Sequence, residues 1–354
     1  MTAQRAAAKG DWPADGLEEV TCCPVCSSER RTLLHEALED RVFFCAPGKW
    51  SMWRCEECST GYLNPRPTAE TLGLAYQSYY THADAEDKQY GGSLISRIKL
   101  GLRNNFLNKE FGTKFKPALP GGHWLVSRRP KQQASIVQFH TYRSLPIPKS
   151  GQKLLDVGCG NGKFLTTAQK MGWTVEGVEL DEQAVEAANR RGFKVFAGTL
   201  EQAGYNDAEF DAVTICHVME HLPRPVETMR ECVRILKPGG VLWVAVPNLG
   251  SAGHTRFGAS WRGLEPPRHL VMFTLNSLKR LMTDAGLKVA SEQGGLITAS
   301  TYEQSDAISQ GLDPNVWRPI PEALQHESEA ALKEGLRHPE RSDEVIVVAK
   351  KPAG

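Results

Sequence analysis

The segment LLDVGCGNGKFL (residues 154–165) limits the folds open to this chain more than any other stretch. Apolar residues flank Asp156 before three glycines at alternate positions, and residues of helical character follow. This order predicts a buried strand that leads through a glycine-rich turn into a helix. A second apolar segment, TVEGVEL (174–180), carries the acidic residue Glu179 near its end. Together these features predict a nucleotide-type ligand lying across the carboxyl ends of parallel strands.

The spacing within the turn narrows the choice of ligand. A dinucleotide-binding turn needs a glycine at the sixth position counted from Gly158, where this chain has Lys163. A phosphate-binding loop needs Ser or Thr after Gly-Lys, but Phe164 follows here. S-adenosylmethionine (SAM) carries no phosphate. Asp156 offers a carboxylate for its ammonium group, and Glu179 can accept hydrogen bonds from both of its ribose hydroxyls.

Two downstream segments extend this interpretation. With FDAVTICHVMEHL (210–222) and ILKPGGVLWVAVPN (235–248), the chain resembles the class I SAM-dependent methyltransferases over about residues 151–350. The resemblance implies an α/β, Rossmann-like fold with a seven-stranded, doubly wound sheet. It also implies that these residues bind the cofactor: Asp156, Gly158, Gly160, Gly162, Glu179, Leu180, Leu200 and His217. The alternative is a Rossmann-like domain in which the glycines form only a tight turn.

Strand and helix patterns alternate from Lys153 onward, which predicts a parallel, doubly wound sheet. The expected strands are KLLDVG (153–158), TVEGVEL (174–180), KVFAG (194–198), FDAVTIC (210–216), VLWVAVP (241–247), LKVASEQ (287–293) and EVIVVAK (344–350). Asp181 and Thr274 are the expected N-caps of the helices 182–191 and 275–285. The family's last strand is antiparallel and inserts between its neighbours, and EVIVVAK occupies that place.

The cysteines gather near the N-terminus, with six of the nine between Cys22 and Cys58. In a reducing compartment such a cluster indicates a metal site rather than disulfides. Two Cys-x-x-Cys pairs, Cys23 with Cys26 and Cys55 with Cys58, predict a four-thiolate zinc ribbon. Cys22, Cys45 and His35 are spare ligand candidates. Four thiolates leave no open coordination position, so the zinc would be structural. The alternative is a small subdomain with reduced, metal-free thiols.

A basic helical segment follows the expected ribbon. Residues 94–145 contain ten basic residues, against Glu110 alone: Arg97, Lys99, Arg103, Lys109, Lys114, Lys116, Arg128, Arg129, Lys131 and Arg143. Apolar residues recur there at helical spacing. One interpretation is an amphipathic cap that docks an anionic partner such as a membrane surface, a carrier protein or RNA. We favour the other, a solvated helix over the cofactor site whose charge is balanced by the acidic stretch 322–334.

These patterns divide the chain into four expected parts. They are a disordered tail (1–18), a zinc-ribbon module (19–66), a basic helical linker or cap (67–150) and a SAM-dependent methyltransferase domain (151–354). The N-terminus lacks the apolar core of a secretory signal, and no apolar run approaches the ~18 residues of a membrane span. We therefore expect a cytoplasmic protein. The net charge of +1 predicts no general attraction to polyanions.

Candidate catalytic residues follow the expected fourth strand, in His217-Val-Met-Glu220-His221. His217 and Glu220 are expected at the methionine end of the cofactor, and His221 is expected to face the methyl acceptor. H-x-x-E-H is also an inverted zinc-peptidase signature, but that site needs a long helix, which Pro223 and Pro225 would interrupt. Glu-His at this place also resembles ubiquinone-type O-methyltransferases. A purely structural His221, bonded to backbone at a helix start, is the alternative.

The segment 257–274 after the expected fifth strand is the candidate acceptor site. We expect His269 or His221 to act as general base for a hydroxyl, and Arg262 or Arg268 to pair with a substrate anion, beside Trp261. Two prolines, 266 and 267, are expected to hold the backbone extended. In the alternative interpretation, these residues only pin the loop to the domain.

The sequence therefore predicts an O-methyltransferase that acts on a small or carrier-bound metabolite, with SAM as cofactor and structural Zn²⁺. The whole pattern resembles bacterial enzymes of surface-polysaccharide or secondary-metabolite pathways. One alternative is an RNA base methyltransferase, because ribosomal-RNA guanine methyltransferases share the order of ribbon, basic linker and SAM domain. The near-zero net charge counts against it. A second alternative is a non-catalytic SAM-binding scaffold.

Overall fold

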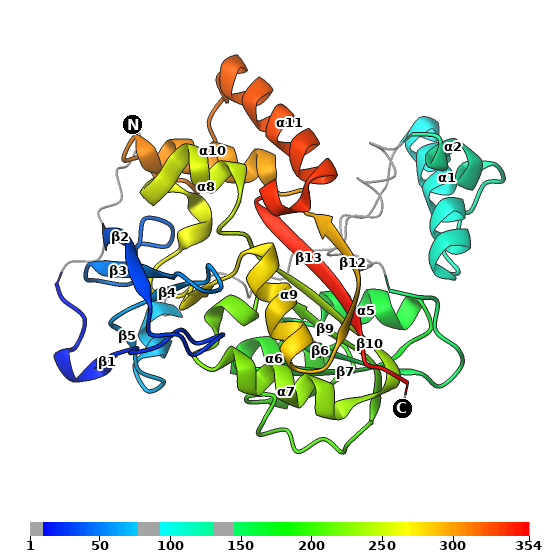
Figure 1. The fold of residues 1–354 in the computed structure, drawn as a ribbon. Coiled ribbons are helices and arrows are strands. Elements are labelled where there is room, and N and C mark those ends of the chain that lie inside the picture. Colours follow the sequence, from blue (N-terminus) through cyan, green and yellow to red (C-terminus); the bar gives the residue numbers. More distant parts are fainter. Residues whose placement is uncertain (1–9, 77–92, 130–142, 144, 354) are drawn as a thin grey trace. The chain divides into compact units, whose positions relative to one another are not determined.

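The computed structural model describes residues 10–76, 93–129, 143 and 145–353. The chain forms two compact units. Figure 1 labels the helices and strands in chain order. One unit contains residues 1–79, 215–234 and 244–354, and the other contains residues 80–214 and 235–243. Each unit therefore combines segments that are far apart in the sequence.

A seven-stranded, mostly parallel sheet confirms the predicted fold class, and its strand order is β12-β13-β10-β9-β6-β7-β8. The strands are β6 (Lys153–Val157), β7 (Thr174–Glu179), β8 (Lys194–Ala197), β9 (Phe210–Cys216), β10 (Leu236–Pro247), β12 (Lys288–Gly294) and β13 (Glu344–Lys350). Strands β6, β7 and β8 pair in parallel, whereas β13 runs antiparallel to β12 and lies between β12 and β10. All seven predicted strands are present, and the last has the expected place and direction.

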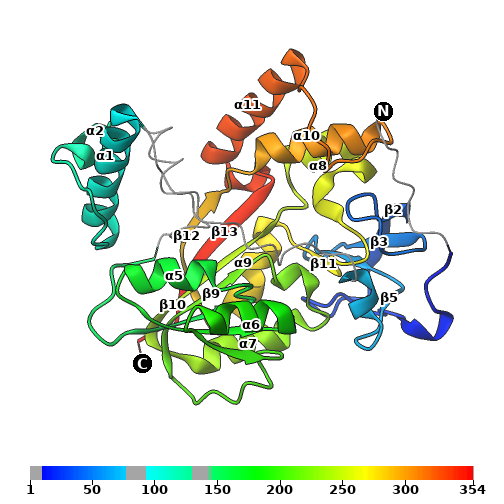
Figure 2. The same cartoon turned by 180° about the vertical axis from the view of Figure 1, so that it is seen from behind.

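The glycine turn follows β6, whose Leu154 and Leu155 are fully buried. Gly162 begins helix α5 (Lys163–Lys170) with a φ of 79°, and a Cβ there would lie 2.9 Å from the ring of Phe193. Only glycine fits this backbone conformation and this space without strain. Helix α6 (Glu182–Arg190) begins at the expected cap, where the Asp181 carboxylate accepts a hydrogen bond from Ala184 N at 2.8 Å. Figure 2 shows α5 and α6 on the near side of their strands.

The ribbon module is a second sheet, with the order β11-β4-β3-β2. Its strands are β2 (Arg31–Leu38), β3 (Trp50–Cys55), β4 (Gly61–Leu63) and β11 (Val271–Met272). The fourth strand comes from the segment after His269, and it pairs antiparallel with β4 through Val271 opposite Tyr62. Trp50, Met52, Tyr62 and Leu63 form the buried core of the module. The ribbon sheet is therefore completed by a distant part of the chain.

In the same unit, the described residues begin at residue 10. Within the expected disordered tail, a 3₁₀ helix η1 (Ala14–Gly16) leads into β1 (Leu17–Glu18), which pairs with β5 (Arg66–Pro67). Trp12 stabilises this segment, because its indole is buried and donates a hydrogen bond to the carbonyl of Gly16 at 3.1 Å. Residues 1–9 lie outside the described residues.

The described residues of this unit also form the α-helices α7 (Pro225–Ile235), α8 (Ala252–Phe257), α9 (Leu275–Asp284), α10 (Thr298–Ser309) and α11 (Glu322–Arg337). Helix α9 begins at the expected cap Thr274, in a capping box with Ser277, and packs against β12 and β13. Helices α10 and α11 lie side by side around Tyr302, Leu324 and Ala331, as both views show. The acidic stretch of the sequence forms most of α11.

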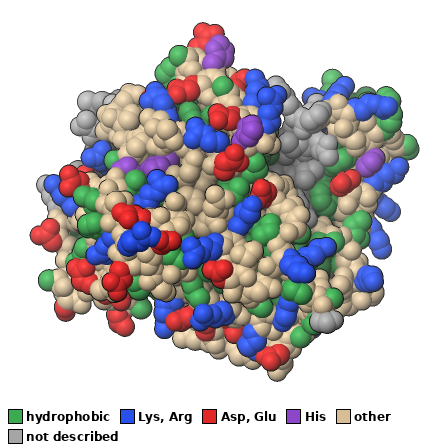
Figure 3. All heavy atoms as spheres, in the orientation of Figure 1, with side chains coloured by type: hydrophobic (Ala, Val, Ile, Leu, Met, Phe, Trp, Pro, Cys, Tyr) green, Lys and Arg blue, Asp and Glu red, His purple; other side chains and the backbone are tan. Residues whose placement is uncertain are grey.

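The basic segment forms a helical hairpin of α1 (Leu94–Phe111) and α2 (Gly122–Ser127). Phe106 and Leu107 are fully buried within it, whereas Leu94 and Ile95 are exposed. Basic side chains outnumber acidic ones over this hairpin (Figure 3). Lys131 and the remainder of the expected linker, residues 77–92 and 130–142, lie outside the described residues. In the described part of the chain, no helix has the length and apolar character needed to cross a membrane.

Candidate active site and metal centre

Glu179 ends β7 beside the glycine turn and is held there by backbone amides. Its Oε2 accepts a hydrogen bond from Gly160 N at 2.8 Å, and its Oε1 accepts from Leu180 N at 2.8 Å and Asp181 N at 3.1 Å. The side chain of Leu180 is exposed, whereas that of Leu200 is buried. The expected acid therefore has a fixed orientation at the carboxyl end of its strand.

Asp156 is fully buried in β6 and accepts a hydrogen bond from Thr214 Oγ1 at 2.9 Å. It also forms an ion pair with Arg143, whose guanidinium lies 3.6 Å from the ring centroid of Phe164. Burial raises the pKa of Asp156, and the Arg143 charge opposes that rise. Among the described residues, Asp156 Oδ2 has no hydrogen-bond partner. The sequence counted Arg143 only as one of many basic residues, so its pairing with Asp156 was missed.

His217 follows β9 in a left-handed backbone conformation, with a φ of 53°, and its amide donates to Ala245 O at 3.0 Å. Its imidazole lies between two carboxylates: Nδ1 is 3.1 Å from Glu220 Oε1, and Nε2 is 2.6 Å from Glu344 Oε1. Burial alone would lower the pKa of His217, but these carboxylates raise it well above its usual value. His217 is therefore an imidazolium, and Glu344 is a partner that the sequence gave no reason to choose.

His221 ends the short 3₁₀ helix η3 (Met219–His221). Its Nδ1 lies 3.0 Å from the carbonyl oxygen of Arg268 and 3.0 Å from the hydroxyl of Tyr76. A carbonyl can only accept, so Nδ1 carries a proton. The contact with a backbone carbonyl agrees with the structural interpretation of His221, and it does not involve Nε2.

His269 lies beside His221, with ring centroids 4.8 Å apart. Its Nδ1 donates to Gly263 O at 2.7 Å, which leaves Nε2 with a lone pair. Burial lowers the pKa of His269 to about 4, so the ring is neutral near pH 7. Glu220 is fully buried, its Oε2 has no hydrogen-bond partner in the described structure, and the ligand atoms of Glu220, His221 and His269 lie within 4.8 Å of one another. Such a cluster can accept a proton or hold a cation.

The expected acceptor residues are less accessible than the sequence suggested. Trp261 is buried and donates to Asp343 Oδ1 at 3.0 Å. Arg268 is fully buried and pairs with Asp40 and Glu265. Arg262 is partly exposed and pairs with Glu265. For Trp261 and Arg268 these contacts agree with the interpretation in which they pin the loop to the domain.

The two prolines of this loop do not hold an extended backbone, so that expectation was wrong. The Pro266–Pro267 peptide is cis, and residues 266–268 form a turn closed by a hydrogen bond from Arg268 N to Glu265 O at 3.0 Å. Glu265 itself has a left-handed φ of 40°. The buried ion pairs of Arg268 and Glu265 draw this segment inward, which sequence pattern alone does not reveal.

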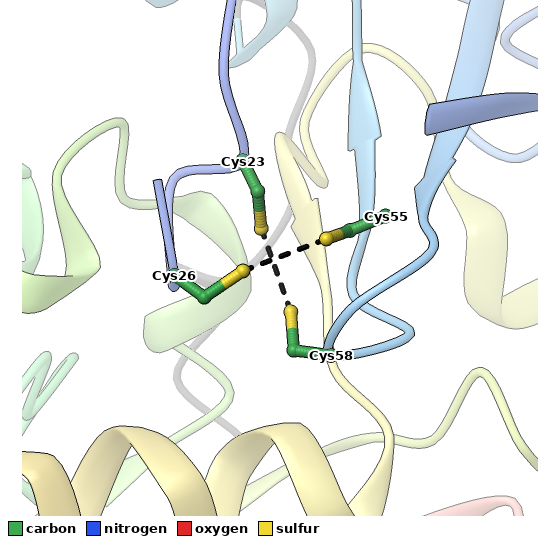
Figure 4. Close-up of side chains that lie close together, drawn as sticks. All are labelled: Cys23, Cys26, Cys55 and Cys58. Carbon is green, nitrogen blue, oxygen red and sulfur yellow. Dashed lines mark hydrogen bonds between the residues drawn. The ribbon is translucent and has the colours of Figure 1, made fainter. Parts of the chain in front are cut away.

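Four cysteine sulfurs of the ribbon module converge on one point (Figure 4). The Sγ atoms of Cys23 and Cys58 are 3.5 Å apart, as are those of Cys26 and Cys55. Tetrahedral zinc with Zn–S bonds of about 2.3 Å places its sulfurs about 3.8 Å apart, so the set fits this ion. Of the spare candidates, Cys45 contacts Asp40 and Ala75, and His35 contacts His254.

The local structure also excludes the peptidase alternative. An inverted zinc-peptidase motif lies within a long helix. Here His217 precedes a 3₁₀ helix of three residues, and Leu222 has an extended conformation. His217 and His221 also bond to different partners, so they do not present one shared pair of ligands.

Comparison with known proteins identifies methyltransferases as similar to this chain. A family model described as a methyltransferase domain matches residues 128–292. A ubiquinone biosynthesis O-methyltransferase from Thiobacillus denitrificans is 35% identical over 104 residues, which are 27% of this chain and 44% of that protein. One from Azoarcus sp. is 28% identical over 179 residues, which are 47% of this chain and 76% of that protein. The chain spans about half the length of most of these curated relatives.

Among solved structures, a SAM-dependent methyltransferase from Archaeoglobus fulgidus is similar over 65% of this chain and 99% of that chain, with 20% identity and a TM-score of 0.43. The family match runs through the glycine turn, Glu179 and the histidine loop, and the strand order is the one that the resemblance implied. Residues 128–292 therefore match a methyltransferase domain, and the sheet around them has the strand order implied by the resemblance to class I SAM-dependent methyltransferases.

Proposed function

We propose that this protein transfers a methyl group from SAM to a hydroxyl of a small or carrier-bound acceptor, with a histidine as general base. The names of the curated relatives support O-methylation. The observation that carries the proposal is the contact of His221 with His269, two imidazoles whose Nδ1 atoms each face a backbone carbonyl and which lie in one cluster with buried Glu220. A hydroxyl becomes a nucleophile when such a group removes its proton.

For the cofactor, we propose that Glu179 binds the ribose hydroxyls and that Asp156 faces the ammonium group through its remaining oxygen. Leu180, Leu200 and the turn glycines belong to the same compact unit and complete this part of the site, and His217 of the other unit stays a predicted cofactor residue. SAM supplies an electrophilic methyl group on a sulfonium, so the protein must position the acceptor, exclude water and take up one proton. A partly exposed Arg262 is the best placed of the proposed residues to meet a substrate anion.

For the metal, we propose structural zinc on Cys23, Cys26, Cys55 and Cys58. All four positions are thiolates, so such an ion has no free coordination position for chemistry, and its contribution is to folding. A thiol-rich zinc module also favours a reducing compartment, and we place the reaction in the cytoplasm.

The acceptor is best found with methyl-labelled SAM and a fractionated extract. We expect label to enter a small-molecule or carrier-protein fraction. His221→Gln should lower turnover about 10²- to 10⁴-fold, the usual contribution of a general base, without weakening SAM binding measured by calorimetry. His269→Gln tests the alternative base. Full turnover in both variants would exclude a histidine base, and SAM binding without transfer to any fraction would favour a scaffold.

A further inference from the structure

We propose that Arg268 is a positioning residue: Asp40 of the ribbon module holds its side chain, and its backbone carbonyl orients His221. The catalytic part of this inference rests on the proposed function. The positional part rests on contacts within one compact unit, which contains Asp40, His221 and Arg268. The ribbon module would then act on the reaction through the tautomer of one histidine.

The side chain of Arg268 forms its hydrogen bonds with other residues of the protein. Arg268 Nη2 donates to Asp40 Oδ1 at 2.8 Å and Nη1 donates to Asp40 Oδ2 at 3.2 Å, while Nε donates to Glu265 Oε1 at 3.1 Å. Neither Arg268 nor Asp40 exposes any side-chain surface. A bidentate, buried ion pair of this kind fixes the orientation of the guanidinium in addition to neutralising its charge. The guanidinium therefore anchors its own backbone and is inaccessible to a substrate anion.

Asp40 is itself held independently of Arg268. Its carboxylate accepts backbone hydrogen bonds at 3.0–3.3 Å from Val42, Phe43, Cys45 and Ala46. The loop after β2 thus wraps around this carboxylate, which makes Asp40 a rigid part of the ribbon module. A rigid anchor at one end of the ion pair determines where Arg268 lies.

The backbone beside Arg268 connects this anchor to the histidine loop. Arg268 O accepts from His221 Nδ1 at 3.0 Å. Two residues later, Leu270 N donates to Glu220 O at 2.8 Å, and Leu270 O accepts from Leu63 N of β4 at 3.1 Å. A hydrogen bond to one ring nitrogen selects the tautomer and leaves the other nitrogen for chemistry. Displacing the Arg268 carbonyl would therefore release His221 from the tautomer that keeps Nε2 unprotonated.

The positional part can be tested without turnover, by NMR of ¹⁵N-histidine-labelled full-length protein. The His221 signals are assigned by their loss in His221→Gln. We expect the wild type to show a fixed Nδ1–H tautomer, and Asp40→Asn and Arg268→Lys to show a mixed or reversed one. Arg268→Lys keeps the charge but loses the bidentate pairing, so it limits the folding defect. Glu327→Gln, which removes only the partly exposed pair with Arg256, is the control.

The catalytic part is tested by a double-mutant cycle on turnover. Asp40→Asn should lower kcat about 10- to 100-fold, as expected when a reacting group is misplaced, and leave SAM affinity within twofold. In a His221→Gln background, the same substitution should cause no further loss, because both changes act on one group. Losses that multiply in the cycle would overturn the proposal.

An unchanged His221 tautomer in folded Asp40→Asn and Arg268→Lys would overturn it as well. Folding of each variant is checked by zinc content and circular dichroism. If the wild type transfers no methyl group, the proposed function fails, while the NMR result still decides whether Arg268 positions His221.

Discussion

At the scale of single residues, this molecule buries its charges in matched groups. His217 lies between Glu220 and Glu344, and Arg268 lies between Asp40 and Glu265. Removing one partner of a buried pair leaves an uncompensated charge, which costs far more than an exposed pair contributes. Asp156 with Arg143 follows the same rule in the other compact unit. These positions should therefore tolerate substitution poorly.

The half-buried His254 should make the protein sensitive to mild acid. Burial and the neighbouring His35 lower the pKa of His254 to about 4, so below its unfolded value of 6.5 the unfolded chain binds more protons than the folded one. Stability is therefore lost as the pH falls from about 6.5 towards 4. His254→Gln should reduce the loss between pH 7 and pH 5 by about 2 kcal/mol, at about 1.4 kcal/mol per pKa unit.

Urea unfolding at the two pH values measures this difference. His326→Gln, on the exposed face of α11, serves as the control and should keep the wild-type pH dependence. An equal loss of stability in His254→Gln and wild type would contradict the assignment.

Glu179 should account for a large part of SAM affinity. Replacing its charge by an amide weakens hydrogen bonds to the ribose hydroxyls, and bonds to charged groups contribute about 1.5–3 kcal/mol. Glu179→Gln should therefore weaken binding about 10- to 100-fold in calorimetry. Glu182→Gln, an exposed position at the start of α6, should bind SAM like the wild type. Equal affinity in both variants would remove Glu179 from the cofactor site.

Sequence reasoning found positions that local patterns determine. Asp156 and Glu179 lie at the carboxyl ends of β6 and β7, and His217 directly follows β9, as expected, while their roles stay predictions. Asp40, Tyr76 and Glu344 could not be found, because each acquires its partner from a segment far along the chain. Arg143 could not be found because no local pattern pairs it with Asp156. A buried arginine such as Arg268 also looks the same in sequence as one that awaits an anion. What the sequence does not reveal is which side chains the tertiary structure brings into contact.

At the scale of elements, the strands and helices of the large sheet were predictable from hydrophobic pattern and caps. Strand β11 was not, because two residues carry no periodicity and its partner β4 belongs to the ribbon module. The helical spacing of the basic segment correctly predicted α1, although part of its apolar face is exposed. Short strands are determined by what they pair with.

Zinc removal should open the ribbon sheet selectively. Since Cys55 ends β3 and Cys58 precedes β4, a chelator should abolish amide-exchange protection in β3, β4 and β11 while β6 and β7 stay protected. Hydrogen exchange followed by mass spectrometry locates the change. Cys55→Ser should behave like chelated protein, and Cys22→Ser, which lies outside the four-sulfur cluster, like the wild type. Uniform protection after chelation would exclude a structural metal.

At the scale of the whole molecule, charge and connectivity are the informative properties. The net charge is +1, with the basic excess concentrated in one helical hairpin. The sequence suggested modules arranged one after another, whereas the compact units interleave the first 79 residues with the last 111, counted from residue 244 to 354. Linear boundaries read from composition cannot show such interleaving, because it arises from long-range packing.

This charge distribution bears on the RNA alternative. The basic hairpin offers phosphate contacts, but contacts of this kind are non-specific and weaken steeply with salt, and the net charge of the chain is only +1. We expect no RNA binding tighter than about 10 μM at 150 mM salt, the range of non-specific affinity, in fluorescence anisotropy with a structured RNA. Tight binding that falls steeply with salt, and that is lost in Arg97→Gln/Arg103→Gln, would instead support an RNA substrate.

Strand β11 gives the ribbon sheet an edge that the N-terminal residues cannot supply for themselves. A shortened protein that starts after residue 76 would leave the backbone of Val271–Met272 with unsatisfied hydrogen-bond donors and acceptors. Such an unpaired strand can pair with another chain, so the shortened protein should aggregate. Exchange of the N-terminal part between related enzymes would fail for the same reason unless residues 261–273 travelled with it. The unit that can be transferred between proteins is thus discontinuous: it consists of the N-terminal part together with residues 261–273, and domain-exchange experiments should transfer both segments.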